Sequence, residues 1–223
     1  MTRSQPQKSQ ILIVDDHPLF REGLQQMIAR TADLKVCGEA EDAPQALEAI
    51  PKLKPDLVLV DISLGSGSGI DLVKAIKSKH ADLPVLVVSM HDESLYAERS
   101  LRAGAMGYVM KHERGKKVRE AIYRVLGGDV YLSEKMSISL LSKLTTGKSE
   151  KPVSPLEMLS NRELEVFCLL GQAKGTRKIA EELNLNIATI NTFRARIKEK
   201  LQLKTSMELL LHATQWFREN GGK

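Results

Sequence analysis

The sequence predicts an α/β domain with a doubly wound, five-stranded parallel sheet, followed by a small all-α domain. Short runs of consecutive apolar residues alternate with helical patterns up to about residue 127, which is typical of βαβ units. Two of these runs end in carboxylates, at the sheet edge where parallel strands end and ligands bind. From Leu156 onward the apolar spacing is helical only, and a length of 223 residues suits two small domains.

The expected strands are continuous apolar runs, as in a sheet that is buried on both faces. They lie at 11–14, 36–40, 57–60, 84–89 and 107–110. Helical spacing follows each strand, at 18–28, 43–50, 70–76, 95–103 and 116–126. Pro18 suits a first helical turn, Pro51 is expected to end the second helix, and Gly127-Gly128 to cap the last. Neither a GxGxxG motif nor a P-loop lysine is present, so a nucleotide site is not indicated.

A change of composition separates the two predicted domains. A short helix is expected within 130–144, and residues 145–155 are Thr, Gly, Lys, Ser and Pro for the most part, which is typical of a linker. We expect a disordered tail at 1–9, the α/β domain at 10–127, a linker at 128–155 and the helical domain at 156–220.

The composition is that of an ordinary globular protein, with 42% hydrophobic and 27% charged residues and a net charge of +5. Cys37 and Cys168 lie within apolar segments and form neither a disulfide framework nor a CxxC metal spacing. The first ten residues lack the apolar core of a signal peptide, and no apolar run approaches the roughly 20 residues that span a bilayer. We therefore expect a cytoplasmic protein.

Carboxylates gather at one edge of the predicted sheet. Asp15 and Asp16 follow the first strand and Asp61 follows the third, so the three are expected to converge. Crowded carboxylates repel unless a cation lies among them, and Mg²⁺ takes oxygen ligands of this kind. Ser89 and Lys111 end the next two strands and would face phosphoryl oxygens. A carboxylate in such a site can accept a phosphoryl group, because the transfer depends mostly on positioning and charge neutralisation.

In order and placement these groups resemble the receiver domain of bacterial two-component response regulators, a flavodoxin-like fold, over about residues 9–127. The matching residues are Asp15, Asp16, Asp61, Ser89, Tyr108 and Lys111. The resemblance implies that Asp61 accepts a phosphoryl group from a sensor histidine kinase. It implies that Asp15, Asp16, Asp61 and the Ser63 backbone carbonyl hold Mg²⁺, and that Lys111 pairs with Asp61 or its phosphoryl group. Ser89 then turns inward to the phosphate and Tyr108 follows it.

The sequence departs from many receivers at two loop positions. His112 stands where a cis proline often follows the lysine, so a trans peptide is expected. Gly65 stands where a proline often lies four residues after the acceptor, in a Gly-Ser-rich segment that is expected to be a loop. These departures concern loop rigidity and phosphoryl lifetime and remove no reacting group. His17 and His91 lie near the same edge and are expected to be loop residues. Taken alone, Tyr108 is equally compatible with a core aromatic.

The helical half has the pattern of a helix-turn-helix unit. Ser160 and Glu163 form a predicted capping box, and Thr176 is expected to cap a second helix. A third helix is expected at 188–201, with Ile190 and Ile197 on its apolar face and several basic residues on the rest. Behind a helix and a tight turn, a basic helix of this kind favours recognition of the DNA major groove.

Residues 156–220 are similar to the LuxR-type DNA-binding domain of NarL/FixJ regulators. The matching residues are Leu159, Arg162, Glu163, Glu165, Val166, Ile179, Ala180, Leu183, Thr189, Ile190, Ile197, Lys200 and Leu201. The expected DNA contacts are Thr176, Asn191, Thr192, Arg194, Ala195, Arg196, Lys198 and Lys200. Asn191 and Phe193 replace a lysine and a histidine common in the family, so its base preference is not transferred. A last helix, 207–217, is a dimerisation face in the family, which implies a homodimer on phosphorylation and double-stranded DNA with two half-sites.

The favoured interpretation is a transcription factor switched by phosphorylation of Asp61, rather than a turnover enzyme. One alternative is a receiver that works without phosphorylation. Another is a phosphohydrolase that forms an aspartyl-phosphate, which Ser63 argues against because such enzymes of the haloacid-dehalogenase type carry a second aspartate at that position.

Overall fold

The computed structural model describes residues 8–65, 67–145 and 155–220. The chain divides into two compact units, Met1–Leu140 and Leu141–Lys223. Among the described residues, no helix combines the length and the apolar character that crossing a membrane requires.

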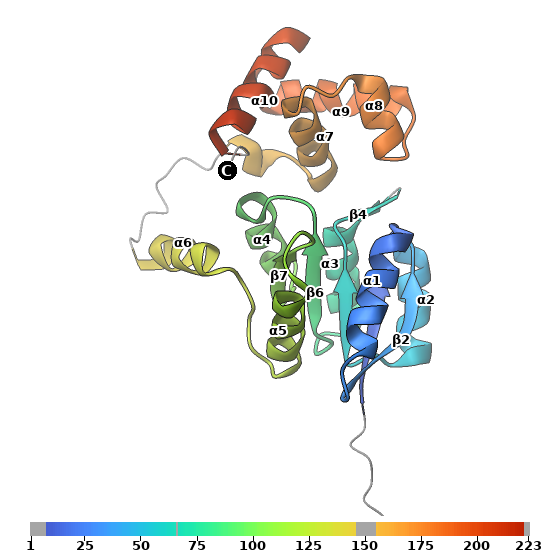
Figure 1. Cartoon of the computed structure of the whole chain (residues 1–223). Helices are drawn as coiled ribbons and strands as arrows, with labels where there is room; N and C mark the ends of the chain where they lie inside the picture. The colour runs from blue at the N-terminus through green and yellow to red at the C-terminus, as the bar shows by residue number, and fades with distance from the viewer. Residues whose placement is uncertain (1–7, 66, 146–154, 221–223) are drawn as a thin grey trace, which may run out of the picture. The chain divides into compact units, whose positions relative to one another are not determined.

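The first unit is built on five parallel strands, and the predicted α/β class is confirmed. In spatial order they are β2 (Leu34–Ala40), β1 (Ser9–Val14), β3 (Leu57–Val60), β6 (Val85–Ser89) and β7 (Gly107–Met110). The helices are α1 (Pro18–Ala29), α2 (Ala43–Leu53), α3 (Gly69–Lys79), α4 (Glu93–Arg102) and α5 (Gly115–Leu126). Helices α1 and α5 cover one face of the sheet, and α2, α3 and α4 cover the other (Figure 1). The strand order changes direction between β1 and β3, so a crevice is expected at their carboxyl ends.

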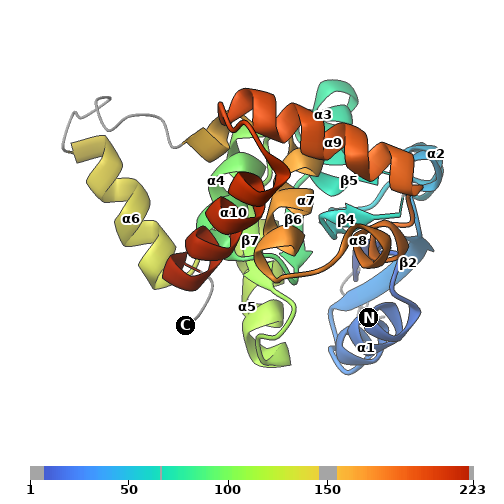
Figure 2. The same cartoon turned by 90° about the horizontal axis from the view of Figure 1, so that it is seen from above.

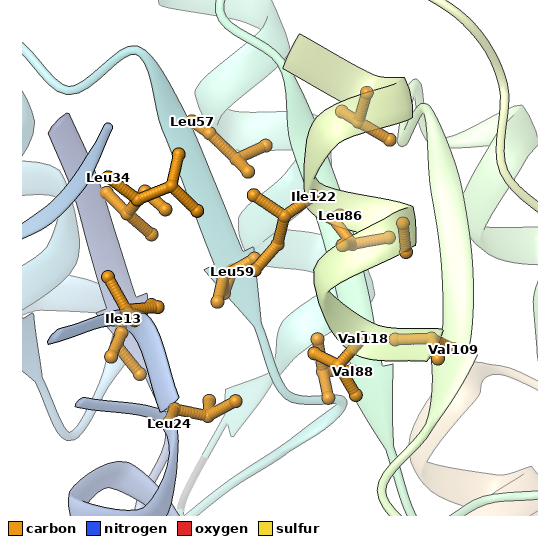
Figure 3. Packing of buried hydrophobic residues seen from close by; sticks show 14 of the residues in the cluster. Ile13, Leu24, Leu34, Leu57, Leu59, Leu86, Val88, Val109, Val118 and Ile122 are labelled. Atoms are coloured by element: carbon orange, nitrogen blue, oxygen red, sulfur yellow. The ribbon is translucent and has the colours of Figure 1, made fainter. Parts of the chain in front are cut away.

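The strands carry apolar residues on both faces because helices bury both. On the face covered by α1 and α5, Ile13, Leu59 and Leu86 pack with Leu24 of α1 and Ile122 of α5 (Figure 3). All five side chains are buried. This packing removes the alternation of apolar and polar residues and explains why the strands are continuous apolar runs in the sequence.

Two local predictions in this unit were wrong. Helix α2 does not end at Pro51 but continues to Leu53, because a proline in the last turn removes only its own N–H, while the Lys54 amide still bonds the Ile50 carbonyl at 2.9 Å. The glycine-rich segment after Asp61, expected to be a loop, contains a short antiparallel pair, β4 (Ser63–Leu64) and β5 (Gly67–Ser68).

The chain beyond α5 returns to the sheet before it leaves the first unit. The amide of Tyr108 donates to the Tyr131 carbonyl at 2.9 Å, and the Tyr131 amide donates to the Met106 carbonyl at 3.0 Å. The Ser133 amide then donates to the Glu93 carboxylate of α4 at 2.9 Å. The predicted short helix follows as α6 (Glu134–Thr145). Most of the predicted linker at 145–155, and of the predicted tail at 1–9, lies outside the described residues, although Ser9 already belongs to β1.

The second unit is all-helical, as predicted. It consists of the 3₁₀ turn η1 (Pro155–Met158) and of α7 (Asn161–Gly171), α8 (Thr176–Glu182), α9 (Ile187–Lys200) and α10 (Ser206–Asn220). Helices α8 and α9 are neighbours, and α10 follows the far end of α9 and packs on α7 (Figure 2). The capping box of Ser160 and Glu163 is present at the start of α7. Thr176 is not a cap, since the N-cap of α8 is Gly175.

Candidate functional site

Two buried carboxylates lie at the carboxyl ends of β1 and β3. Asp15 is 2% exposed and Asp61 3% exposed, each directly after its strand. Together with Asp16 and His17 they present ligand atoms that all lie within 4.8 Å of one another. The predicted convergence of these carboxylates is therefore a feature of the structure, and the close spacing of like charges requires compensation.

Lys111 supplies part of that compensation. Its ammonium lies 2.6 Å from Asp15 Oδ2 and 2.7 Å from Asp61 Oδ2, and its side chain is 3% exposed. The backbone amide of Lys111 donates to the Ser89 carbonyl at 2.8 Å, which ties the β7 end to the β6 end. The ring of Phe20 lies under the ammonium, 4.5 Å from Nζ to the ring centroid. The peptide bond to His112 is trans, as expected.

Burial and a neighbouring like charge disfavour the ionised form of the Asp61 carboxyl. Burial, followed by the charge of Asp15, raises its pKa to about 6, against the opposing effects of Lys111 and of the Ser89 hydroxyl. At neutral pH Asp61 is still mostly ionised and therefore nucleophilic. A divalent cation beside it would favour that ionised form.

His17 and Asp16 complete the rim of the pocket. The Nδ1 atom of His17 lies 2.7 Å from Asp16 Oδ1, 3.2 Å from Asp15 Oδ1 and 3.8 Å from Asp61 Oδ2. Asp16 Oδ2 accepts a hydrogen bond from the Gly65 amide at 2.9 Å, whereas the buried Asp16 Oδ1 faces His17 Nδ1. Three carboxylates this close together present the oxygen ligands that a divalent cation takes.

The acceptor loop is held by its own backbone. The Ile62 amide donates to Asp61 Oδ1 at 2.7 Å, and the Gly69 amide donates to the Ile62 carbonyl at 2.7 Å. A Cβ atom at Gly69 would lie 1.8 Å from the Asp61 carbonyl oxygen, so only glycine allows α3 to start so close to the acceptor. Ser63, whose carbonyl is the expected fourth ligand, lies two residues beyond Asp61 at the start of β4.

The two expected switch residues lie together on the neighbouring strands. Ser89 and Tyr108 are fully buried, and the Tyr108 hydroxyl donates to the His91 carbonyl at 2.6 Å. The His91 amide donates to the Ser89 hydroxyl at 3.3 Å, and His91 Nε2 lies 2.8 Å from Ser63 Oγ. Burial raises the pKa of Tyr108 well above its usual value, so the phenol stays neutral and can act as a donor. Tyr108 therefore faces inward, against the loop that follows Ser89.

On the second unit, α9 exposes one polar face. Ile190 and Ile197 are buried against the other helices, whereas Asn191, Thr192 and Arg196 are exposed. The small side chain of Ala195 lies on the same exposed face, where it leaves room for close approach to another surface. Phe193 is half-buried.

Three of the expected DNA contacts are paired with side chains on other helices of the unit. Arg194 donates to the Thr176 hydroxyl of α8 at 2.5 Å. Lys200 lies 2.6 Å from the buried carboxylate of Glu163. Burial raises the pKa of Glu163, but hydrogen bonds from Lys200 and Ser160 outweigh it and the net shift is downward. Lys198 is half-buried. The sequence could not assign these partners, because they lie on other helices.

Two family models account for both units. The response regulator receiver domain matches residues 11–123, and the luxR family of bacterial regulatory proteins matches residues 157–213. The chain belongs to the two-component response regulators of the NarL/FixJ type. It is a response regulator with a receiver domain and a LuxR-type DNA-binding domain, in agreement with the resemblance in its sequence.

Relatives match this response regulator over both units. Response regulator GacA of Pseudomonas viridiflava is 32% identical over 205 residues, covering 92% of this chain and 95% of the relative. Oxygen regulatory protein NreC of Staphylococcus carnosus is 31% identical over 207 residues, covering 91% and 95%. Among solved structures, RcsB of Salmonella enterica bound to promoter rprA with phosphomimetic BeF₃⁻ is 25% identical, with a TM-score of 0.60 and coverage of 93% and 98%.

The structure also contains site residues that the sequence did not predict. His17 was expected only to be a loop residue near this edge, and its imidazole lies among the carboxylates. Its position directly after Asp15-Asp16 was the available signal. Arg21 of α1 is 8% exposed and donates to the Asp15 carbonyl, and nothing in its local sequence distinguishes it from a surface arginine.

Proposed function

We propose that this response regulator accepts a phosphoryl group on Asp61 from a sensor histidine kinase and that the phosphorylated form controls transcription by binding DNA. The main support is the contact of Asp61 and Asp15 with the buried Lys111 ammonium inside a matched receiver domain. Because the proposed partners are DNA and a kinase, we also propose that the protein works in the bacterial cytoplasm.

In the proposed reaction, a carboxylate oxygen of Asp61 attacks the phosphorus, and the bond from phosphorus to the kinase histidine nitrogen breaks. The carboxylates of Asp15, Asp16 and Asp61, with the Ser63 carbonyl, would hold Mg²⁺, which neutralises the charge on the transferred group. Lys111 is already 2.7 Å from Asp61 and would pair with a phosphoryl oxygen. The protein would act on itself and lose the group by self-dephosphorylation, without turnover of an external substrate.

The switch would begin at Ser89 and Tyr108. When Ser89 turns toward the phosphoryl group, it leaves the His91 amide, and the bond from Tyr108 to the His91 carbonyl can rearrange. Two hydrogen bonds lead from this region to α6: Tyr108 N to the Tyr131 carbonyl, and Ser133 N to Glu93 at the start of α4. A shift of either partner would reach the segment that joins the two domains.

For DNA, we propose that α9 enters the major groove. Asn191 can pair with adenine, and Arg196 and Lys198 would contact phosphates or bases, with Thr192 and Ala195 at the closest approach. Arg194, Thr176 and Lys200 would contribute next to their present partners. Met207 and Leu211 are exposed on α10 and support a homodimer of the phosphorylated form.

The test compares wild type with Asp61→Asn, each with an acyl phosphate and Mg²⁺. Mass spectrometry should find one added phosphoryl group on wild type that hydroxylamine removes, and none on the variant. DNA fragments selected by wild type should then bind phosphorylated wild type more tightly than the variant, with an affinity that falls as salt rises. Equal affinity and equal oligomer size with and without the phosphodonor would support the alternative receiver that works without phosphorylation.

A further inference from the structure

Arg21 is a buried arginine of α1 whose guanidinium has three partners. Its Nε lies 3.0 Å from Glu39 Oε2, its Nη2 lies 2.7 Å from Glu41 Oε1, and its Nη1 donates to the backbone carbonyl of Asp15 at 2.6 Å. The Arg21 side chain is 10% exposed, whereas those of Glu39 and Glu41 are 34% and 60% exposed. The guanidinium therefore connects α1 and the end of β2 to the first residue of the carboxylate cluster.

The ion pairs alone do not explain this arrangement. Ion pairs with the two glutamates need only the charge of the guanidinium at the sheet edge, and they do not require the third bond to a backbone carbonyl. Partly buried ion pairs are also weak evidence for a gain in stability. The third bond is directed at the peptide group that joins Asp15 to Asp16. Because a peptide group is planar, the direction of its carbonyl sets the direction of the Asp16 N–H and the path of the chain into Asp16.

The contacts on either side of this peptide show how much depends on its orientation. The Asp15 amide donates to the Ala40 carbonyl at 3.0 Å, and the His17 amide donates to Asp15 Oδ1 at 2.9 Å. The carboxylate of Asp16 accepts from the Gly65 amide with one oxygen, and its other oxygen is buried 2.7 Å from His17 Nδ1. A rotation of the Asp15–Asp16 peptide would move both oxygens relative to Asp61.

We infer that Arg21 is a positioning residue of the pocket: through the Asp15 carbonyl, it holds Asp16 in the orientation that a divalent cation requires. This inference rests on the proposed Mg²⁺-assisted phosphorylation of Asp61. Groups that orient metal ligands typically contribute about 10–100-fold to metal affinity, so loss of the bond to Asp15 should weaken Mg²⁺ binding about tenfold.

The experiment measures Mg²⁺ affinity of the full chain by isothermal titration calorimetry. Arg21→Met removes every donor and keeps an unbranched side chain about as long as the aliphatic part of arginine. Arg21→Lys keeps the charge, but its single ammonium goes to the glutamates, because a carboxylate accepts from a cation more strongly than a carbonyl does. Both variants should raise the Mg²⁺ dissociation constant about tenfold. The matched control Glu41→Gln weakens a partner of the same guanidinium and leaves the bond to Asp15, so its dissociation constant should stay within about twofold of wild type.

A second readout separates positioning from folding. The rate of Asp61 phosphorylation by an acyl phosphate is measured against Mg²⁺ concentration: the Arg21 variants should need about tenfold more Mg²⁺ and then reach the wild-type plateau. If Arg21→Met does not fold, Arg21→Lys decides the outcome. A wild-type dissociation constant in Arg21→Lys, or an equal loss in Glu41→Gln, would overturn the inference. Failure of wild type itself to bind Mg²⁺ would instead refute the proposed function.

Discussion

Replacing Asp61 with asparagine is expected to stabilise the metal-free protein at neutral pH. Burial beside Asp15 raises the pKa of Asp61 from 3.8 to about 6 in the folded state. Between these values the folded state binds more protons than the unfolded state, so its stability falls as pH rises from 3.8 to 6. Above pH 6 Asp61 is ionised in both states, and the folded state then carries the full free-energy cost of burying its charge.

The size of that cost follows from the pKa difference. A difference of about 2 units, at about 1.4 kcal/mol each, corresponds to about 3 kcal/mol at pH 7.5. Asparagine has the same shape without the charge, and Lys111 keeps its contact with Asp15 at 2.6 Å. Asp61→Asn should therefore exceed wild type in free energy of unfolding by up to about 3 kcal/mol at pH 7.5, and the gain should shrink as pH falls toward 4.

The assay is urea unfolding of the full chain in a chelator, at several pH values between 4 and 8. The sequence has one tryptophan, Trp216 of α10, so its fluorescence follows the DNA-binding domain while circular dichroism follows both domains. A shift seen by circular dichroism but not by fluorescence assigns the effect to the receiver. The exposed control Asp129→Asn should change stability by less than about 0.5 kcal/mol. A destabilised Asp61→Asn, or a gain independent of pH, would refute the electrostatic argument.

Three further outcomes are expected. Gly69→Ala should destabilise the receiver and abolish phosphorylation, because its Cβ would lie 1.8 Å from the carbonyl oxygen of Asp61. The control Gly23→Ala has open space around its added Cβ in α1 and should raise the free energy of unfolding in urea by about 0.5–1 kcal/mol. Glu93→Ala removes the bond to the Ser133 amide, so it should leave the phosphorylation rate unchanged but reduce the phosphorylation-dependent gain in DNA affinity; an unchanged gain would exclude this route. Lys200→Met removes the cation beside the buried Glu163 carboxylate and should lower the free energy of unfolding by about 1–3 kcal/mol, as followed by fluorescence. Arg196→Ala should leave stability unchanged and lower the slope of log affinity for DNA against log salt concentration by about one. The reverse pattern would mean that Lys200 contacts DNA and Arg196 stabilises the fold.

The fold class could be predicted from the sequence because its determinants are local. A strand covered by helices on both faces of its sheet needs apolar residues on both sides, so it has a continuous apolar run such as 57–60. The alternation of such runs with helical spacing limits the topology to parallel βαβ units. The same limit brings Asp15 and Asp61 together, since both end neighbouring parallel strands. The capping box of Ser160 and Glu163 is equally local and is present in the structure.

Only the tertiary structure decided which side chains distant in sequence form pairs. Arg21 meets Glu39 and Glu41, and Lys200 meets Glu163, although each of these basic residues has the local sequence of a surface cation. Periodicity assigns a residue to a face of its own element, but the distance between two elements depends on strand register, helix packing and the direction in which each chain turns. Register, packing and chain direction therefore decide which groups come within hydrogen-bond distance. The sequence by itself determined the scaffold and its acidic edge, while only the structure decided which distant side chains Arg21 and Lys200 contact.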